Sequence, residues 1–141
     1  MQRYRLLLCA VFASALSGCG HFPVLSLGNP AAKNEDSPPE LKAFLSEAET
    51  AAKQILKEDN LGEWNIEYEK VKQLYDQMPR EALRPSLQKD CDDIVSQMLL
   101  GKLAIGLKKD DAYAGRKRCL DVSAEIARLV KDAKTISSKK K

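Results

Sequence analysis

The chain has 141 residues, of which 44% are hydrophobic and 30% are charged, and its formal net charge is +3. A chain of this length supports one domain with a core of its own. Acidic and basic side chains are mixed along the sequence, and the only sustained basic run is at its end. This pattern excludes the basic face of a nucleic-acid-binding domain, so we expect a single domain with no nucleic acid partner.

The segment 1–18 has the pattern of a secretory signal peptide. Arg3 and Arg5 provide positive charge, and an apolar or small stretch follows over residues 6–16. That stretch is too short to span a bilayer. Without the signal segment, the mature chain loses two basic side chains and no acidic one, so it is close to neutral.

The signal segment ends in Leu16-Ser17-Gly18-Cys19, which resembles the lipobox of bacterial lipoproteins. The resemblance implies that a diacylglycerol is attached to the Cys19 sulfur, that cleavage falls before Cys19, and that the new amine is acylated. Two or more acyl chains hold a protein stably on a membrane. Enterobacterial lipoproteins retained in the inner membrane commonly carry Asp after this cysteine, so Gly20 favours the periplasmic face of the outer membrane, with surface display as the alternative.

Residues 19–37 contain two prolines and no helical periodicity, and we expect them to form a tether. Residues 38–136 are predicted to form a helical domain, because apolar side chains recur at helical spacing in four stretches. Ser37 and the glutamate at the third position after it predict a capping box, and Asn60 predicts the next N-cap. Pro79 ends the second stretch and Pro85 begins the third. The predicted fold is all-α, a small bundle of about four helices in two antiparallel hairpins.

Cys91 and Cys119 are the thiols left in the mature domain. An even pair of cysteines in an exported, oxidising compartment predicts a disulfide, with two buried free thiols as the alternative. A helical hairpin can bring them together only if it turns near their midpoint, and Gly101 and Gly106 bracket that midpoint. We therefore expect one disulfide and a turn between Gly101 and Lys109.

Sites for catalysis or for metals are not evident in the sequence. His21 is the only histidine and lies close to Cys19, so zinc and haem spacings are missing. There is no glycine-rich phosphate loop and no CxxC pair. Neighbouring carboxylates such as Asp92-Asp93 diverge by about 100° on a helix, and solvation is the expected role. We predict no enzyme activity, no cofactor, no metal and no small-molecule substrate.

Three aromatic residues share one helical face, and they are Trp64, Tyr68 and Tyr75. Core packing is the first interpretation of this face. A partner groove is the alternative, because Trp and Tyr are common interface anchors.

Two basic groups are further candidate contacts. The first, a possible contact for an acidic partner, consists of Arg116, Lys117 and Arg118. The second lies in the basic tail, residues 137–141, and consists of Lys139, Lys140 and Lys141. Lysines near an anionic surface each gain about 1 kcal/mol, so this tail is a candidate contact for anionic lipid or wall polymer.

Together these features predict a non-catalytic, membrane-anchored periplasmic lipoprotein. The favoured function is that of a binding or accessory subunit in an envelope assembly of the secretion, conjugation or pilus type. One alternative is an inhibitor or immunity lipoprotein that neutralises a toxin or lysozyme. The other is a structural tether between membrane and wall.

Overall fold

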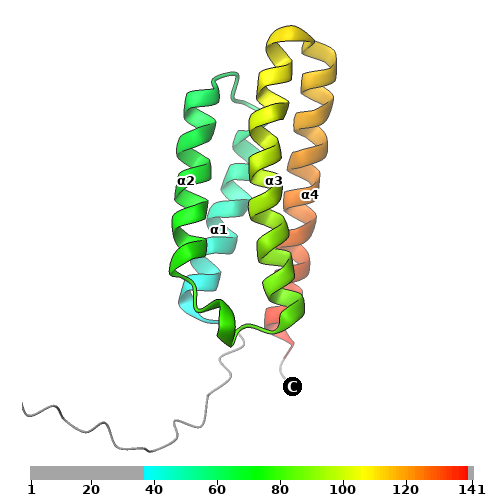
Figure 1. Cartoon of the computed structure of the whole chain (residues 1–141). Helices are drawn as coiled ribbons and strands as arrows, with labels where there is room; N and C mark the ends of the chain where they lie inside the picture. Colours follow the sequence, from blue (N-terminus) through cyan, green and yellow to red (C-terminus); the bar gives the residue numbers. More distant parts are fainter. Residues whose placement is uncertain (1–36, 140–141) are drawn as a thin grey trace, which may run out of the picture. The chain divides into compact units, whose positions relative to one another are not determined.

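The computed structural model describes residues 37–139, which form a bundle of four α-helices (Figure 1). The helices run alternately in opposite directions, so α1 with α2 and α3 with α4 make two antiparallel hairpins. Each helix packs against two neighbours in a ring. The elements are α1 (Pro39–Gln54), α2 (Leu61–Gln77), the 3-10 helix η1 (Arg80–Ala82), α3 (Pro85–Asp110) and α4 (Ala112–Ser138). The predicted all-α class and four-helix bundle are confirmed.

Three helix boundaries lie where the local sequence places them. The Asn60 side chain accepts a hydrogen bond from the Gly62 amide at 2.8 Å, and so caps α2. Pro79 follows the end of α2, and Pro85 occupies the first turn of α3, where its missing N–H has no helical partner to lose.

The predicted capping box at Ser37 is wrong. Helix α1 begins at Pro39, so Pro38 holds the N-cap position and no side chain caps the helix. Ser37 lies one position too early, because an N-cap side chain must reach the second or third amide after its own.

The turn between α3 and α4 lies at Asp111 and not between Gly101 and Lys109, so that prediction is also wrong. The Asp111 carboxylate accepts hydrogen bonds from the amides of Tyr113 and Ala114 at 3.1 and 2.9 Å. This contact caps α4 and places negative charge at its N-terminus, which the helix dipole favours. Gly101 stays helical because packing outweighs its low helix propensity.

Cys91 and Cys119 are free thiols, so the predicted disulfide is wrong. Gly115 lies against the backbone of Lys108, and this register puts Cys91 level with Asp132 on α4, far from Cys119. At ~1.5 Å per residue the offset between the two cysteines is roughly 20 Å, well beyond the reach of a disulfide. Both thiols are buried, and burial raises the pKa of Cys91 to about 12 and also raises the pKa of Cys119.

The contact between α2 and α3 is built around Trp64. This side chain is fully buried, and its indole N–H donates to the Met98 carbonyl at 3.1 Å. The ring lies against Gly101, where a Cβ would stand 2.5 Å from a ring carbon. Gly101 therefore permits close approach of two helices, which is a different role from the predicted turn.

The α3–α4 hairpin extends beyond the α1–α2 loop at one end of the bundle (Figure 1). Helices α3 and α4 have 26 and 27 residues, against 16 and 17 for α1 and α2. The Lys108 ammonium donates to the Glu58 carbonyl at 3.1 Å, which marks where the α1–α2 loop meets the hairpin. Gly115 fixes the α3–α4 register, because a Cβ there would stand 2.3 Å from the Lys108 backbone nitrogen.

Candidate protein-binding surface

The half of α3 nearest the Asp111 turn carries large apolar side chains on the side away from the core. The exposed residues are Leu99, Leu100, Leu103 and Leu107, with exposed fractions of 45%, 45%, 67% and 41%. We call these four residues the leucine face. The core side of the same segment carries the buried residues Met98, Ala104 and Ile105. Contiguous exposed apolar surface marks interaction sites.

A hollow between α3 and α4 continues the leucine face onto α4. Its lining includes Leu100, Leu103, Leu107, Arg118, Asp121 and Glu125. Glu125 is paired with Arg128, with 2.6 Å between nitrogen and oxygen. Among residues 37–139, no ion pair holds Arg118 or Asp121. The apolar floor of the hollow is thus bordered by one positive and one negative side chain that are free to meet a partner.

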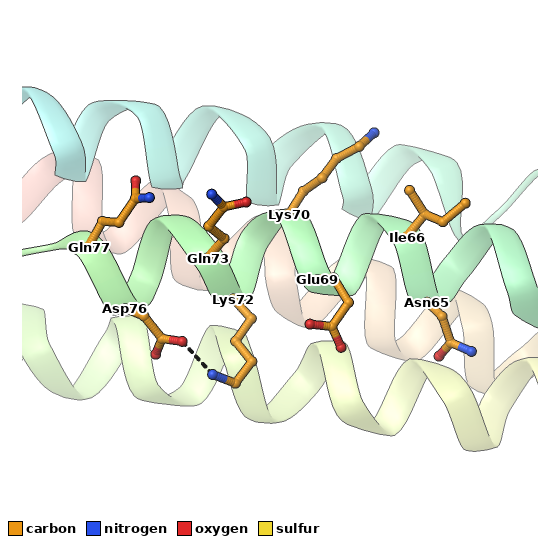
Figure 2. Close-up of a pocket in the computed structure, with 8 residues that line it drawn as sticks. All are labelled: Asn65, Ile66, Glu69, Lys70, Lys72, Gln73, Asp76 and Gln77. Carbon is orange, nitrogen blue, oxygen red and sulfur yellow. Dashed lines mark hydrogen bonds and ion pairs between the residues drawn. The ribbon is translucent and has the colours of Figure 1, made fainter. Parts of the chain in front are cut away.

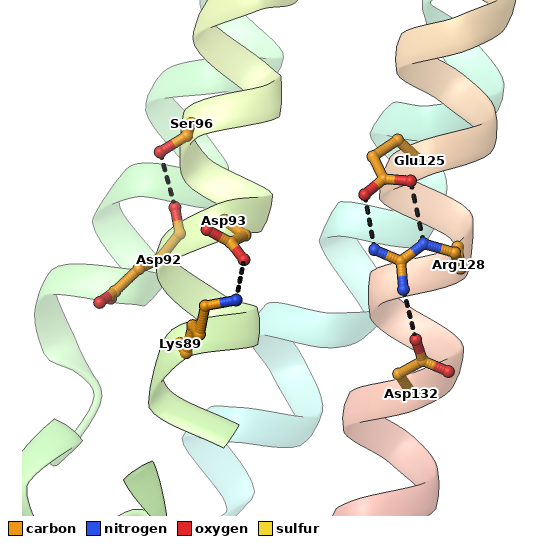
Figure 3. A network of polar contacts seen from close by, with 7 residues as sticks. All are labelled: Lys89, Asp92, Asp93, Ser96, Glu125, Arg128 and Asp132. Atoms are coloured by element: carbon orange, nitrogen blue, oxygen red, sulfur yellow. Dashed lines mark hydrogen bonds and ion pairs between the residues drawn. The ribbon is translucent and has the colours of Figure 1, made fainter. Parts of the chain in front are cut away.

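The half of the same α3–α4 surface farther from the turn is charged instead (Figure 3). The Arg128 guanidinium donates to Glu125 at 2.6 and 2.9 Å and to Asp132 at 2.8 Å. These contacts raise the pKa of Arg128 and lower the pKa of Glu125. On α3 the Lys89 ammonium lies 3.5 Å from the Asp93 carboxylate. Because these charges already have partners on their own helices, the leucine face is the part of this surface that favours association.

The three aromatic candidates lie in or against the core. Trp64 is fully buried and Tyr68 is 8% exposed, so neither ring can contact a partner in this fold. Tyr75 is half-buried, and its hydroxyl donates to Asp92 and accepts from Arg80 at 2.9 Å. Burial and the Asp92 contact raise the pKa of Tyr75. The first interpretation, core packing, fits Trp64 and Tyr68.

The predicted basic contacts separate in space. Arg116, Lys117 and Arg118 are exposed near the start of α4, and only Arg118 lines the hollow. Lys139 is exposed at the end of α4, and its carbonyl accepts a hydrogen bond from Arg84 at 2.9 Å. Three further candidates lie outside the described residues, and they are Cys19, Lys140 and Lys141. The signal segment, His21 and most of the tether lie outside them as well.

A second hollow lies on the outer side of α2 and is lined by α2 alone (Figure 2). Its lining is polar apart from Ile66, and an ion pair joins Lys72 to Asp76 across one turn. Within residues 37–139 no group of His, Cys, Asp or Glu side chains is arranged to hold a metal ion. In that same part of the chain, no helix has the length and apolarity needed to cross a membrane.

The sequence-based turn prediction concealed the leucine face, because it placed Leu103 and Leu107 in a loop. The signal was nevertheless present in residues 99–107, Leu-Leu-Gly-Lys-Leu-Ala-Ile-Gly-Leu, where helical spacing puts four leucines on one side of a continuous helix and Ala104 and Ile105 on another. Comparisons with protein-family models, with characterised proteins and with solved structures found no match to this chain.

Proposed function

We propose that this chain is a lipid-anchored, non-catalytic lipoprotein of the bacterial envelope that binds a protein through the leucine face. Its role would be that of an accessory subunit in an assembly of the secretion, conjugation or pilus type. The observation that carries the proposal is the exposure of the leucine face on the outer side of α3. Covering apolar surface contributes about 25 cal/mol per Å² to association. The mixed charges of Arg118 and Asp121 fit the polar rim of a protein interface.

The anchor in this proposal rests on the Leu16–Cys19 motif. Acylation of Cys19 would hold the bundle at a membrane without any spanning helix. The periplasmic face of the outer membrane is the proposed location, on the basis of Gly20.

Palmitate labelling tests the anchor in a diderm host that expresses the full chain. Labelled palmitate should enter the wild-type chain and should be absent from the Cys19→Ala variant. Equal incorporation in the two chains would contradict lipidation at this residue.

Photo-cross-linking tests the binding surface in the same cells. A benzoylphenylalanine at Leu103 should form discrete protein adducts, whereas the same group at Ile66 should not. Ile66 is the matched control for Leu103, because the two side chains are 59% and 67% exposed and lie on different helices. Equal adduct formation at both positions would contradict a specific surface.

The identity of the adducts separates the proposed function from its alternatives. Components of an envelope machine, alone or beside a second copy of this chain, would support an accessory subunit. One secreted toxin or lysozyme would support an inhibitor. A muropeptide joined to the C-terminal lysines, surviving boiling detergent, would support a membrane-to-wall tether.

A further inference from the structure

We propose that the leucine face binds a second copy of this chain, in an antiparallel dimer with a two-fold axis across α3 and α4. This inference rests on the proposed function, because it uses the same surface, and it names the partner. It is carried by the spacing of apolar and charged side chains around the hollow between the two helices.

The register of the hairpin shows that these side chains share one centre. Gly115 lies against the backbone of Lys108, so these two residues are at the same height. The midpoint of Leu100 and Leu107 lies four and a half residues before Lys108. The midpoint of Arg118 and Asp121 lies four and a half residues after Gly115. Because α3 and α4 are antiparallel, both midpoints are at the same height in the bundle, which is also the height of Leu103.

A two-fold axis at that height makes the surface complementary to itself. In a two-fold interface, a residue on one side of the axis meets the residue that lies on the opposite side in the other copy. Leu100 then packs on Leu107 of the second copy, and Leu103 packs on the second Leu103. Arg118 meets Asp121 of the second copy, and the reciprocal pair forms on the other side of the axis. Both apolar and charged groups therefore gain partners that the single bundle does not provide.

Charge favours a second copy over an anionic lipid surface or an acidic protein. An anionic lipid surface or an acidic protein would attract Arg118 and would repel Asp121 and Glu125, which line the same hollow. A second copy satisfies Arg118 and Asp121 together. The apolar centre with a charged border also matches the general anatomy of protein interfaces.

Disulfide cross-linking of the full chain in envelope membranes tests the dimer. A cysteine at Leu103 lies near the proposed axis, so mild oxidation of Leu103→Cys should join two copies rapidly. Two copies with different epitope tags establish that the product is a homodimer. Wild type and Ile66→Cys are the controls, because Cys91 and Cys119 are buried and Ile66 is 59% exposed on α2.

A charge exchange tests the orientation of the dimer. Arg118→Asp and Asp121→Arg each turn both inter-copy ion pairs into like-charge contacts. Each single variant, combined with Leu103→Cys, should slow cross-linking by about tenfold. The double variant Arg118→Asp/Asp121→Arg restores opposite charges and should recover the rate within about twofold.

The proposal is overturned if Leu103→Cys forms no more homodimer than Ile66→Cys, or if the double charge exchange does not restore cross-linking. These results can be told apart from failure of the proposed function. Photo-adducts of position 103 with a different protein, and none with a second copy, would preserve the binding function and reject the dimer. Adducts with lipid alone, or none at all, would reject both.

Discussion

Replacing Gly101 by alanine places a methyl group inside the contact between α3 and Trp64. The new Cβ would stand 2.5 Å from Cζ2, 2.6 Å from Cε2 and 2.7 Å from Nε1 of the indole. Carbon atoms in good contact are about 3.5–4.0 Å apart, so the ring or the helix must move by roughly 1 Å. Trp64 is fully buried, and a shift weakens its hydrogen bond to Met98.

The expected change in the free energy of unfolding combines three effects. Overpacking of a core costs about 1–3 kcal/mol, and a weakened buried hydrogen bond costs about 1 kcal/mol more. Alanine has a higher helix propensity than glycine, which offsets about 1 kcal/mol. We therefore expect Gly101→Ala to lower the free energy of unfolding by about 1–3 kcal/mol.

Gly106→Ala is the matched control, because Gly106 lies in the same helix and, apart from its own neighbours in that helix, no atom lies within 4 Å of its Cβ position. This variant keeps only the propensity gain and should stabilise the chain by up to ~1 kcal/mol. Urea unfolding followed by circular dichroism measures both, and fluorescence of Trp64, the only tryptophan, reports the disturbed contact. Equal stability of the two variants, with unchanged fluorescence, would refute the packing role of Gly101.

Three further predictions follow from buried groups. Gly115→Ala should destabilise the bundle by about 3 kcal/mol or more, because the new Cβ would meet the Lys108 backbone at 2.3 Å. Thermal unfolding measures this, and a loss of stability under ~1 kcal/mol would contradict it. Cys91 and Cys119 should resist N-ethylmaleimide until the chain unfolds, because both thiols are buried and their pKa values are raised. Mass spectrometry of the native chain after treatment checks this, and fast alkylation of either thiol would argue against it. One Asp90 carboxylate oxygen is buried without a partner, and burial and neighbouring carboxylates raise the pKa of Asp90 above 3.8. The Asp90 carboxylate therefore binds a proton more readily in the folded state than in the unfolded state. The cost of keeping Asp90 ionised in the folded state is present at neutral pH and is lost as the pH falls toward 3.8. Asp90→Asn should raise the free energy of unfolding at pH 7 by less than about 1 kcal/mol and leave it unchanged at pH 3, as urea titrations at both values would show.

The all-α class and several boundaries could be predicted because they depend on near neighbours in the sequence. The Asn60 cap is completed by the amide of Gly62, and a proline ends or begins a helix through its own ring. The four apolar stripes likewise need only helical periodicity to be recognised.

The turn position and the cysteine pairing depend on contacts between distant residues. Gly101 resembles a helix breaker until Trp64, from a different helix, is placed against it. Once α3 runs on to Asp110, Cys91 and Cys119 are out of register and the leucine face becomes a continuous surface. The expected disulfide and the two glycines thus led to a misplaced turn, and the misplaced turn concealed the candidate binding surface.

If a protein partner covers the leucine face in the envelope, a thiol at position 103 should be shielded there from small alkylating reagents. Leu103→Cys and Ile66→Cys place thiols at sites that are 67% and 59% exposed in the single bundle. N-ethylmaleimide should label position 103 at least about tenfold more slowly than position 66 in intact cells, and equally fast after denaturation. Equal labelling rates in intact cells would show that the leucine face is uncovered and that no protein partner occupies it.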